Sequence, residues 1–534
     1  MKRSETTKES VTMEKHHHHH GCCGCSSSGQ MPRRSFLAAV GGTAVGAAAI
    51  ANATAPSVVP PWKSVPMTTA AMRKELVVQP VLSYRVWNRA EKTSWRGWGG
   101  FHSEADYDAE AARIAQELED IKNKAGFAMK MLPLQRVVNV DQAKAVCAGT
   151  ADVMLIYAAT GDTSDIEALI RPDRYNLMFV RHKSGPVYLW YEIASPRMLR
   201  KMVDTLGQPG LQPCDVVVDD TEQLVWRLRA LSGLRNTLGS KIVAIGDASG
   251  WGAGGQKAPK IAAEKWKLEI IPVSYEDLGK RISSAQADGA LVEKTAAEAA
   301  EYMRQNGVTL STDRGYVERA FLLTEVFKSL MAEAGSSAMT INNCMSTIMP
   351  MSETTACLPL TLINDSGALA FCESDFVVIP SGILMNHICQ TPVFLNDPTY
   401  PHDGLITVAH CTAPRRMDGR NLEKVNLLTH YESDFGAAPK VEFSVGQKIT
   451  MIDPDFDCKR WIGFRGEVLE NPFMDICRSQ VDVSIEGDCN YLAETMCGFH
   501  WMMAYGDHRR ELGYALRKMD IEWDDLTATM EKKA

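Results

Sequence analysis

The sequence predicts an α/β protein in which two successive parallel-sheet regions precede a C-terminal α+β region. Three observations support this fold class. Short apolar runs alternate with helical patterns between residues 76 and 335, which is typical of parallel sheets covered by helices. Residues 405–490 instead contain alternating runs such as LITVAH and VEFSVGQKITMI, which are typical of antiparallel strands. The length of 534 residues is long for a single core and suggests about three domains.

The first predicted domain covers residues 76–210. The run LVVQPVLSYRVW at 76–87 predicts its first strand. A helix is expected over 103–125, because Ser103 and Asp106 form a Ser-x-x-Asp signature of a helix start. Two further apolar runs predict strands at 152–159 and 176–182.

The same pattern restarts in the second predicted domain, residues 211–350. Its apolar runs predict strands at 215–220, 241–247 and 268–274. Helices are expected after the first two of these strands, and a long amphipathic helix is expected to end near Gly335. Both domains are therefore predicted to be Rossmann- or flavodoxin-like parallel-sheet domains.

The third predicted domain, residues 351–534, combines helices with an antiparallel, barrel-like β region. One helix is expected around 377–390, before the alternating runs. A last helix is expected from Asp507 to about Met519.

Residues 1–53 are expected to be an N-terminal tail and an export signal, followed by a linker over 54–75. Arg33 and Arg34 precede Ser-Phe-Leu and a Gly/Ala-rich apolar stretch, which resembles a twin-arginine signal cleaved after Ala53. The protein is therefore expected to use the twin-arginine export machinery and to act in the periplasm or another extracytoplasmic compartment.

The tail before this signal carries His16–His20 with Cys22, Cys23 and Cys25. These side chains can bind metal, but they lie on the part that is expected to be removed. An over-long start, with Met31 as the true first residue, or a soluble extension of the signal explains the tail more simply than a role in metal delivery.

Composition narrows the classes of partner. The formal net charge is −8, and Lys and Arg are dispersed along the chain, so nucleic acid is not an expected partner. Eleven cysteines follow the expected cleavage point, without any CxxC pair. This pattern argues against a zinc ribbon and against a complete set of disulfides. Most of these cysteines are expected to be buried small apolar side chains.

Two loops carry candidate binding residues. In SWRGWGGFH at 94–102, the side chains of Trp95, Arg96 and Trp98 suit the C–H faces and hydroxyls of a sugar, although the loop could equally pack on a neighbouring domain or subunit. GWGAGG at 250–255 has the spacing of a dinucleotide-binding loop. Because the predicted strand ends three residues before the first glycine, a plain loop is favoured over a nicotinamide site.

Acidic residues and a distant histidine suggest a metal site. Glu353 and Asp375 flank an apolar stretch, so the two carboxylates can end separate elements that converge, and His500 can add a nitrogen ligand. Carboxylates with one imidazole suit Mn²⁺, Mg²⁺ or Co²⁺ better than an ion that prefers thiolates. We expect Mn²⁺.

Four motifs of the C-terminal half resemble the L-fucose isomerase and L-arabinose isomerase superfamily. They occur in the order of that family and read ALAFCESDF, PVFLND, VAHCTAP and GFHWMMAYGDHRRELGYALRKMDIE. The resemblance implies a divalent metal held by Glu353, Asp375 and His500, with the two carboxylates also moving protons. It makes His410 the best substrate-contact candidate, followed by Asp397, Glu373 and His430, and it implies a hexamer.

The chemistry that this resemblance implies is the interconversion of an aldose and a ketose. Moving a carbonyl between C1 and C2 requires removal of a proton from carbon and stabilisation of an enediolate, which a divalent ion and a nearby carboxylate can provide. The leading hypothesis is a metal-dependent isomerase of a monosaccharide or derivative. Two alternatives stay open: a sugar-binding protein of the same fold without turnover, and a related metal-dependent lyase, epimerase or oxidoreductase.

Overall fold

The computed structural model of the protein describes residues 69–97, 99–188, 198–200 and 207–533. The expected tail, signal peptide and cleavage point, most of the expected linker and Trp98 lie outside these residues. The described part of the linker contains the helical turn α1 (Thr69–Met72). Thr69 is buried there, and its backbone N–H donates to the carbonyl of Gly367 (2.7 Å).

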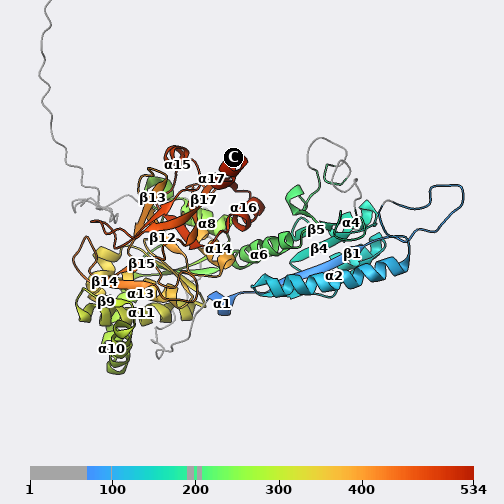
Figure 1. The fold of residues 1–534 in the computed structure, drawn as a ribbon. Helices are drawn as coiled ribbons and strands as arrows, with labels where there is room; N and C mark the ends of the chain where they lie inside the picture. Colours follow the sequence, from blue (N-terminus) through green and yellow to red (C-terminus); the bar gives the residue numbers. More distant parts are fainter. Residues whose placement is uncertain (1–68, 98, 189–197, 201–206, 534) are drawn as a thin grey trace, which may run out of the picture. The chain divides into compact units, whose positions relative to one another are not determined.

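A parallel sheet with strand order β2-β1-β4-β5-β6, in which β3 also pairs with β1, comes first (Figure 1). Its strands are β1 (Leu76–Ser83), β2 (Met129–Met131), β3 (Gln135–Val137), β4 (Val153–Ala158), β5 (Tyr175–Val180) and β6 (Val216–Val218). The associated helices are α2 (Glu104–Ala125), α3 (Val140–Cys147), α4 (Thr163–Leu169), the 3₁₀ turn η1 (Pro213–Asp215) and α6 (Glu222–Thr237). All six residues of β4 are buried, as expected for a strand covered on both faces.

The start of α2 follows the predicted capping pattern. Ser103 accepts a hydrogen bond from the backbone of Asp106, whose carboxylate accepts from the backbone of Ser103. Gly126 ends the helix in the left-handed conformation (φ 61°), where a residue without a Cβ is favoured. The predicted helix over 103–125 is confirmed to within one residue.

A second parallel sheet has the strand order β11-β10-β7-β8. Its strands are β7 (Lys241–Ile245), β8 (Glu269–Val273), β10 (Ala338–Ile341) and β11 (Leu369–Phe371). The helices of this region are α7 (Gly252–Gly255), α8 (Ala258–Lys265), α9 (Tyr275–Ala287), α10 (Gly289–Arg304), α11 (Arg314–Ala334), the π-helical turn η2 (Cys344–Ile348), α12 (Met349–Ser352), α13 (Cys357–Asp365) and α14 (Ile379–Cys389). The long helix α11 ends where predicted, with Gly335 in the left-handed conformation (φ 59°).

The C-terminal region contains a closed antiparallel barrel of six strands, ordered β16-β19-β12-β13-β18-β17 and closed by pairing of β17 with β16. Its strands are β12 (Phe394–Pro398), β13 (Leu405–His410), β16 (Lys448–Pro454), β17 (Arg460–Glu470), β18 (Ser479–Ser484) and β19 (Trp501–Tyr505). A further strand, β20 (Glu522–Asp525), pairs in parallel with β17. The remaining helices are α15 (Cys489–Thr495), α16 (Arg509–Lys518) and α17 (Leu526–Lys533).

A mixed sheet joins distant parts of the sequence. In it, β14 (Lys424–Leu428) pairs with β15 (Ala438–Glu442) in antiparallel and with β9 (Val308–Leu310) in parallel. Likewise β6 belongs to the first sheet and β11 to the second. Strands from both sides of the predicted boundaries at 210/211 and 350/351 therefore share sheets. The mixed α/β class and the antiparallel C-terminal region are confirmed.

Candidate metal centre

A strained turn between β11 and α14 begins the site. Glu373 and Ser374 both have left-handed backbone conformations, with φ of 62° and 48°, and such conformations cost about 1–3 kcal/mol each for residues other than glycine. The loop after β7 holds this turn in place. The Ser374 hydroxyl donates to the carbonyl of Asp247 (2.9 Å), and the backbone of Phe376 donates to the carbonyl of Ser249 (3.0 Å). The strain is therefore compensated by contacts that fix where the acidic side chains point.

Asp375 is buried and its carboxylate oxygens are engaged by the protein itself. One oxygen accepts from the backbone N–H groups of Trp251 (3.3 Å) and Val377 (3.0 Å). The other lies 2.8 Å from Nδ1 of His500. Because a carboxylate is an acceptor, the Nδ1–H of the imidazole donates to it, and Nε2 faces away from Asp375. Asp375 thus orients His500 in the way that carboxylates orient metal-binding histidines.

Four potential ligand atoms converge on the Nε2 side of His500. Its Nε2 lies 3.4 Å from Oε2 of Glu373 and 3.3 Å from Oδ1 of Asp397. Nε2 of His410 lies 3.9 Å from Oε1 of Glu373. Within the described part of the chain, no hydrogen bond satisfies Oε2 of Glu373, Oδ1 of Asp397 or Nε2 of either histidine. Buried polar atoms without a hydrogen-bond partner are costly, which makes these four atoms candidates for holding a metal ion.

The barrel supplies three of these four side chains. Asp397 lies on β12, His410 ends β13 and His500 directly precedes β19. These strands are neighbours, because β12 pairs with both β13 and β19. The other ring nitrogen of His410 lies 3.1 Å from the hydroxyl of Thr412, which fixes the orientation of that imidazole. The ligand atoms of Asp397, His410 and His500 lie within 4.8 Å of one another.

Burial and mutual charge shift the pKa values of this cluster in opposite directions. Burial lowers the pKa of His410 to about 4. Burial also lowers the pKa of His500, but the carboxylates of Asp375, Glu373 and Asp397 outweigh it and raise that pKa well above its usual value. Burial raises the pKa of Asp397 well above its ordinary value, whereas attraction to the two imidazoles outweighs burial at Glu373 and lowers its pKa. Such divergent shifts in one buried cluster are typical of functional sites.

Aromatic rings form one wall beside His500. Trp251 stacks on Phe499, with ring centroids 4.2 Å apart, and both rings meet His500 edge-on. Trp251 comes from the glycine loop at 250–255, where the backbones touch, because a Cβ on Gly250 would lie 2.1 Å from the carbonyl oxygen of Gly255. The glycines therefore allow a tight loop that brings Trp251 to Asp375.

The structure brings together Asp375 and His500 of the predicted triad, but places Glu353 elsewhere. Glu353 is exposed, has a left-handed backbone (φ 51°), and its carbonyl accepts from Nε of Arg319 (2.7 Å). It is absent from every group of described His, Cys, Asp and Glu residues whose ligand atoms lie within 4.8 Å. Asp397 and His410, expected as substrate contacts, lie in the ligand cluster.

The predicted aromatic loop is described only in part. Trp95 is half-buried and Arg96 is exposed, with its guanidinium 5.9 Å from the indole centroid of Trp95. Trp98 lies outside the described residues.

Glu373 was predicted only as a substrate contact, and Cys372 was not predicted as a site residue. The Cys372 thiol lies within 4.8 Å of the ligand atoms of Glu373 and His410. The signal that was available is the order Cys-Glu-Ser-Asp directly after a short apolar strand, because polar side chains at a strand end commonly build sites.

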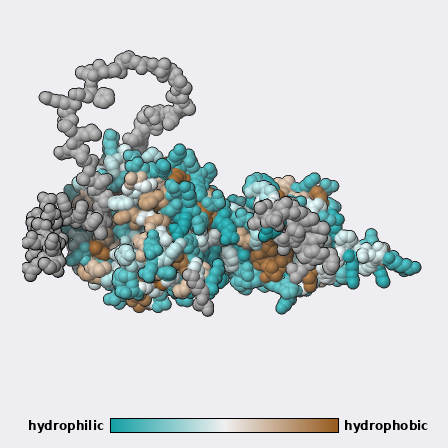
Figure 2. All heavy atoms as spheres, turned by 90° about the horizontal axis from the view of Figure 1, so that it is seen from above, coloured by the Kyte–Doolittle hydropathy of each residue, from teal (hydrophilic) through white to brown (hydrophobic). Residues whose placement is uncertain are grey.

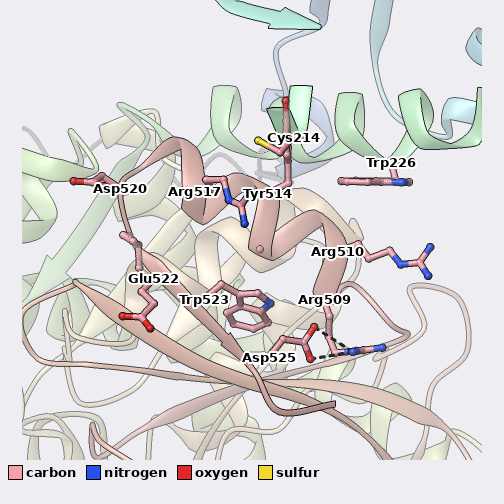
Figure 3. A pocket seen from close by; sticks show the side chains of 12 residues that line it. Cys214, Trp226, Arg509, Arg510, Tyr514, Arg517, Asp520, Glu522, Trp523 and Asp525 are labelled. Atoms are coloured by element: carbon pink, nitrogen blue, oxygen red, sulfur yellow. Dashed lines mark hydrogen bonds and ion pairs between the residues drawn. The ribbon is translucent and has the colours of Figure 1, made fainter. Parts of the chain in front are cut away.

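A separate groove of about 560 Å³ lies against α16 and β20. Figure 3 shows the indole of Trp523 near α16, and the ion pair of Arg509 with Asp525 (2.9 Å) beside it. Among the residues that the structure describes, none of the four convergent ligands lines this groove. The buried cluster is therefore the stronger candidate for chemistry.

The face of the molecule in Figure 2 is mainly hydrophilic. Smaller hydrophobic areas lie between the hydrophilic side chains. Within the described residues, no helix combines the length and the apolar character required to cross a membrane. No protein-family model matches the chain, and no curated protein sequence matches it.

Proposed function

We propose that the protein is a metal-dependent aldose–ketose isomerase that acts on a monosaccharide or a derivative. The observation that carries the proposal is the convergence of four buried ligand atoms, from Glu373, Asp397, His410 and His500, that lack hydrogen bonds within the described chain. Two carboxylates and two imidazoles fit a divalent ion such as Mn²⁺ or Co²⁺, and fit Mg²⁺ less well because it prefers oxygen ligands.

This ligand set modifies the one that the family resemblance implies. His500 is common to both. Asp375 is assigned to orient His500, because the backbone of Trp251 and Val377 and the imidazole already occupy its oxygens. Glu373 and Asp397 replace Glu353 and Asp375 as the carboxylate ligands, and His410 is added.

The wall of the site suits a sugar. The rings of Trp251 and Phe499 are half-buried and lie beside His500, and aromatic faces pack well against the C–H surface of a pyranose or an open-chain sugar. The bound ion would polarise the carbonyl and hydroxyl oxygens of such a substrate. The protein must then supply a carboxylate that removes and returns the proton at carbon.

We assign this proton transfer to Glu353. The family resemblance implies a proton-transfer role for it, and its exposed side chain belongs to none of the groups of potential ligands in the described chain. Asp375 is less suited, because its oxygens accept hydrogen bonds from buried groups.

The decisive experiment combines metal analysis with solvent-deuterium exchange. The full chain is purified without chelator, its metal content is measured, and aldoses and ketoses are screened for deuterium incorporation at the carbon next to the carbonyl. Wild type is compared with Glu353→Gln, His500→Gln and the surface control Glu494→Gln. The isomerase is supported if the wild-type protein binds metal and catalyses deuterium exchange, and if this exchange is lost in both Glu353→Gln and His500→Gln.

Other outcomes separate the alternatives. Saturable sugar binding without exchange would identify a sugar-binding protein. Exchange without a ketose or aldose product would indicate a lyase, an epimerase or an oxidoreductase that shares the first proton transfer. Exchange that persists in Glu353→Gln would contradict the assigned base.

Export and assembly are part of the same proposal. We propose that the mature protein begins after Ala53 in an extracytoplasmic compartment and forms a hexamer of flavodoxin-like and barrel domains, in which Trp95, Arg96 and Trp98 approach a neighbouring site. N-terminal sequencing of the exported protein tests the cleavage point, and Arg33→Lys with Arg34→Lys should block export. Light scattering tests the assembly.

A further inference from the structure

A second cluster of metal-binding side chains lies next to the first but contains thiols. It consists of Cys357, Cys411, Cys477 and His430, all of which are buried. They come from four segments: Cys357 begins α13, Cys411 follows β13, His430 follows β14 and Cys477 precedes β18. Because these residues are far apart in the sequence, the cluster contains no CxxC motif.

Three of the four side chains, Cys357, Cys411 and His430, are close enough to share one ion, and Cys477 lies beside Cys411. The sulfur atoms of Cys357 and Cys411 and a ring nitrogen of His430 lie within 4.8 Å of one another. The Cys411 side chain also makes hydrogen-bond contacts with Cys357, Cys477 and His430. In a tetrahedral zinc site with Zn–S bonds of about 2.3 Å, neighbouring sulfurs are about 3.8 Å apart. Small side-chain rotations therefore suffice to bring the donors of Cys357, Cys411 and His430 onto a common centre, where Cys477 would be the fourth donor.

Hydrogen bonds to backbone carbonyls hold these segments together independently of any ion. Nε of Arg478 donates to the carbonyl of Thr429 (2.7 Å), which ties the neighbour of Cys477 to the neighbour of His430. The backbone of Leu358 donates to the carbonyl of Ala437 (3.2 Å), which anchors the start of α13. The donors are thus preorganised by the fold.

The composition of the cluster favours an ion over the simpler explanations. Buried cysteines commonly act as small apolar side chains, but that role does not require three thiols around one buried imidazole. A disulfide would join only two of the sulfurs and would leave the third thiol and the imidazole without a function. Three sulfurs and one nitrogen are the donor set of structural zinc sites.

We propose that Cys357, Cys411, Cys477 and His430 form a structural Zn²⁺ site, distinct from the oxygen-rich centre. On binding, the thiols become thiolates, their protons pass to solvent, and four bonds form from three sulfurs and one nitrogen to the ion. The closed donor set leaves no position for substrate, so the ion would join α13 to the segments after β13 and β14 and before β18. This proposal does not depend on the isomerase activity.

The test uses the full chain in a background that removes competing N-terminal ligands, with His16–His20 changed to Ala and Cys22, Cys23 and Cys25 changed to Ser. Zinc content is measured by mass spectrometry after dialysis in metal-free buffer. We expect Cys411→Ser and Cys477→Ser each to lose about one zinc per chain relative to the background chain. Cys147→Ser is the matched control, because Cys147 is also buried but its thiol donates to the carbonyl of Leu169.

Cobalt substitution gives an independent readout. Co²⁺ bound to thiolates produces a ligand-to-metal charge-transfer band that an oxygen- and imidazole-bound ion lacks. The band should appear in the background chain, in Cys147→Ser and in the double variant Cys372→Ser with Asp397→Asn, which removes the thiol beside the oxygen-rich centre and one of its carboxylates. It should be absent from Cys411→Ser.

Three results would overturn the proposal. The first is equal zinc content in the background chain and a folded Cys411→Ser or Cys477→Ser variant. The second is a disulfide between any two of the three cysteines, detected by peptide mapping of the native exported protein. The third, which applies even where both variants fail to fold, is the absence of a thiolate charge-transfer band when the background chain is titrated with Co²⁺.

Discussion

Nδ1 of His500 lies 2.8 Å from Oδ2 of Asp375, and both side chains are buried. The carboxylate thereby selects the tautomer of the imidazole and directs Nε2 at Glu373 and Asp397. The pair links the turn after β11 to the strand β19 of the barrel. The orientation of Nε2, the nitrogen proposed to bind metal, therefore depends on a residue outside the proposed ligand set.

Asp375→Asn should weaken metal binding without removing a ligand. The amide can place its N–H₂ against the Nδ1–H of His500, which favours the wrong tautomer, so we expect affinity to fall about 10–100-fold. Competition with a fluorescent chelator measures the change. Asp165→Asn is the control, since Asp165 is also fully buried but pairs with Arg85 (3.1 Å). An unchanged affinity in Asp375→Asn would rule out the orienting role.

Asp397→Asn and Glu353→Gln should separate ligand binding from proton transfer. Asp397 lies among the ligand atoms, whereas Glu353 is exposed. We expect Asp397→Asn to lose the ion of the oxygen-rich centre, and Glu353→Gln to retain it while losing deuterium exchange by about 100-fold or more. Metal analysis and exchange are measured on the same samples. Metal loss in Glu353→Gln but not in Asp397→Asn would instead support Glu353, Asp375 and His500 as the ligands.

Gly250→Ala should disturb the site from the glycine loop. The new Cβ would lie 2.1 Å from the carbonyl oxygen of Gly255, so the loop must shift and move the Trp251 N–H away from Asp375. We expect a loss of about 1–3 kcal/mol in the free energy of unfolding, with weaker metal binding. Gly289→Ala is the matched control, because a Cβ there meets nothing within 4 Å. Denaturant titrations compare the two, and equal stabilities would show that the close approach is unimportant.

His387→Gln should make the protein less sensitive to acid. His387 is buried in α14, where burial lowers its pKa to about 3, against about 6.5 in an unfolded chain. As the pH falls from about 6.5 towards 3, the unfolded chain binds a proton that the folded chain does not, so stability is lost in this window. At pH 5 this loss is about 2 kcal/mol.

The measurement is the difference in the free energy of unfolding between pH 7.5 and pH 5. We expect this difference to be about 2 kcal/mol smaller in His387→Gln than in wild type. The exposed His402→Gln serves as the control for loss of an imidazole. An identical difference in wild type and His387→Gln would show that His387 is not a source of the acid sensitivity.

Much of the fold could be predicted because local patterns agree with the tertiary structure. The Ser103 cap, the end of α11 at Gly335 and the antiparallel character of 405–490 each depend on neighbouring residues. The pairing of strands from different predicted domains in one sheet could not be predicted from such local patterns. The pairing of β9 with β14 joins Val308 to Val425, and no local pattern in either strand specifies such a distant partner.

The candidate site was predictable to a similar extent. His500 and Asp375 were selected, and their contact is present. Glu353 was preferred to Glu373 as a ligand because of its spacing in the sequence. The position of the Glu373 carboxylate instead depends on left-handed backbone conformations at Glu373 and Ser374, which residues other than glycine rarely adopt. The thiol cluster was missed because its four members come from separate segments.

His410 and Cys411 are consecutive residues at the end of β13, yet they belong to different clusters. Cys411 directly follows the last residue of β13, so the same peptide contributes an imidazole to one cluster and a thiol to the other. Deleting one residue of β13 would place the Cys411 sulfur among the carboxylates, whereas inserting one residue would place the His410 imidazole among the thiols. The length of this strand is thus a shared constraint on both proposed centres, because a change of register made for one of them would also alter the donor atoms of the other.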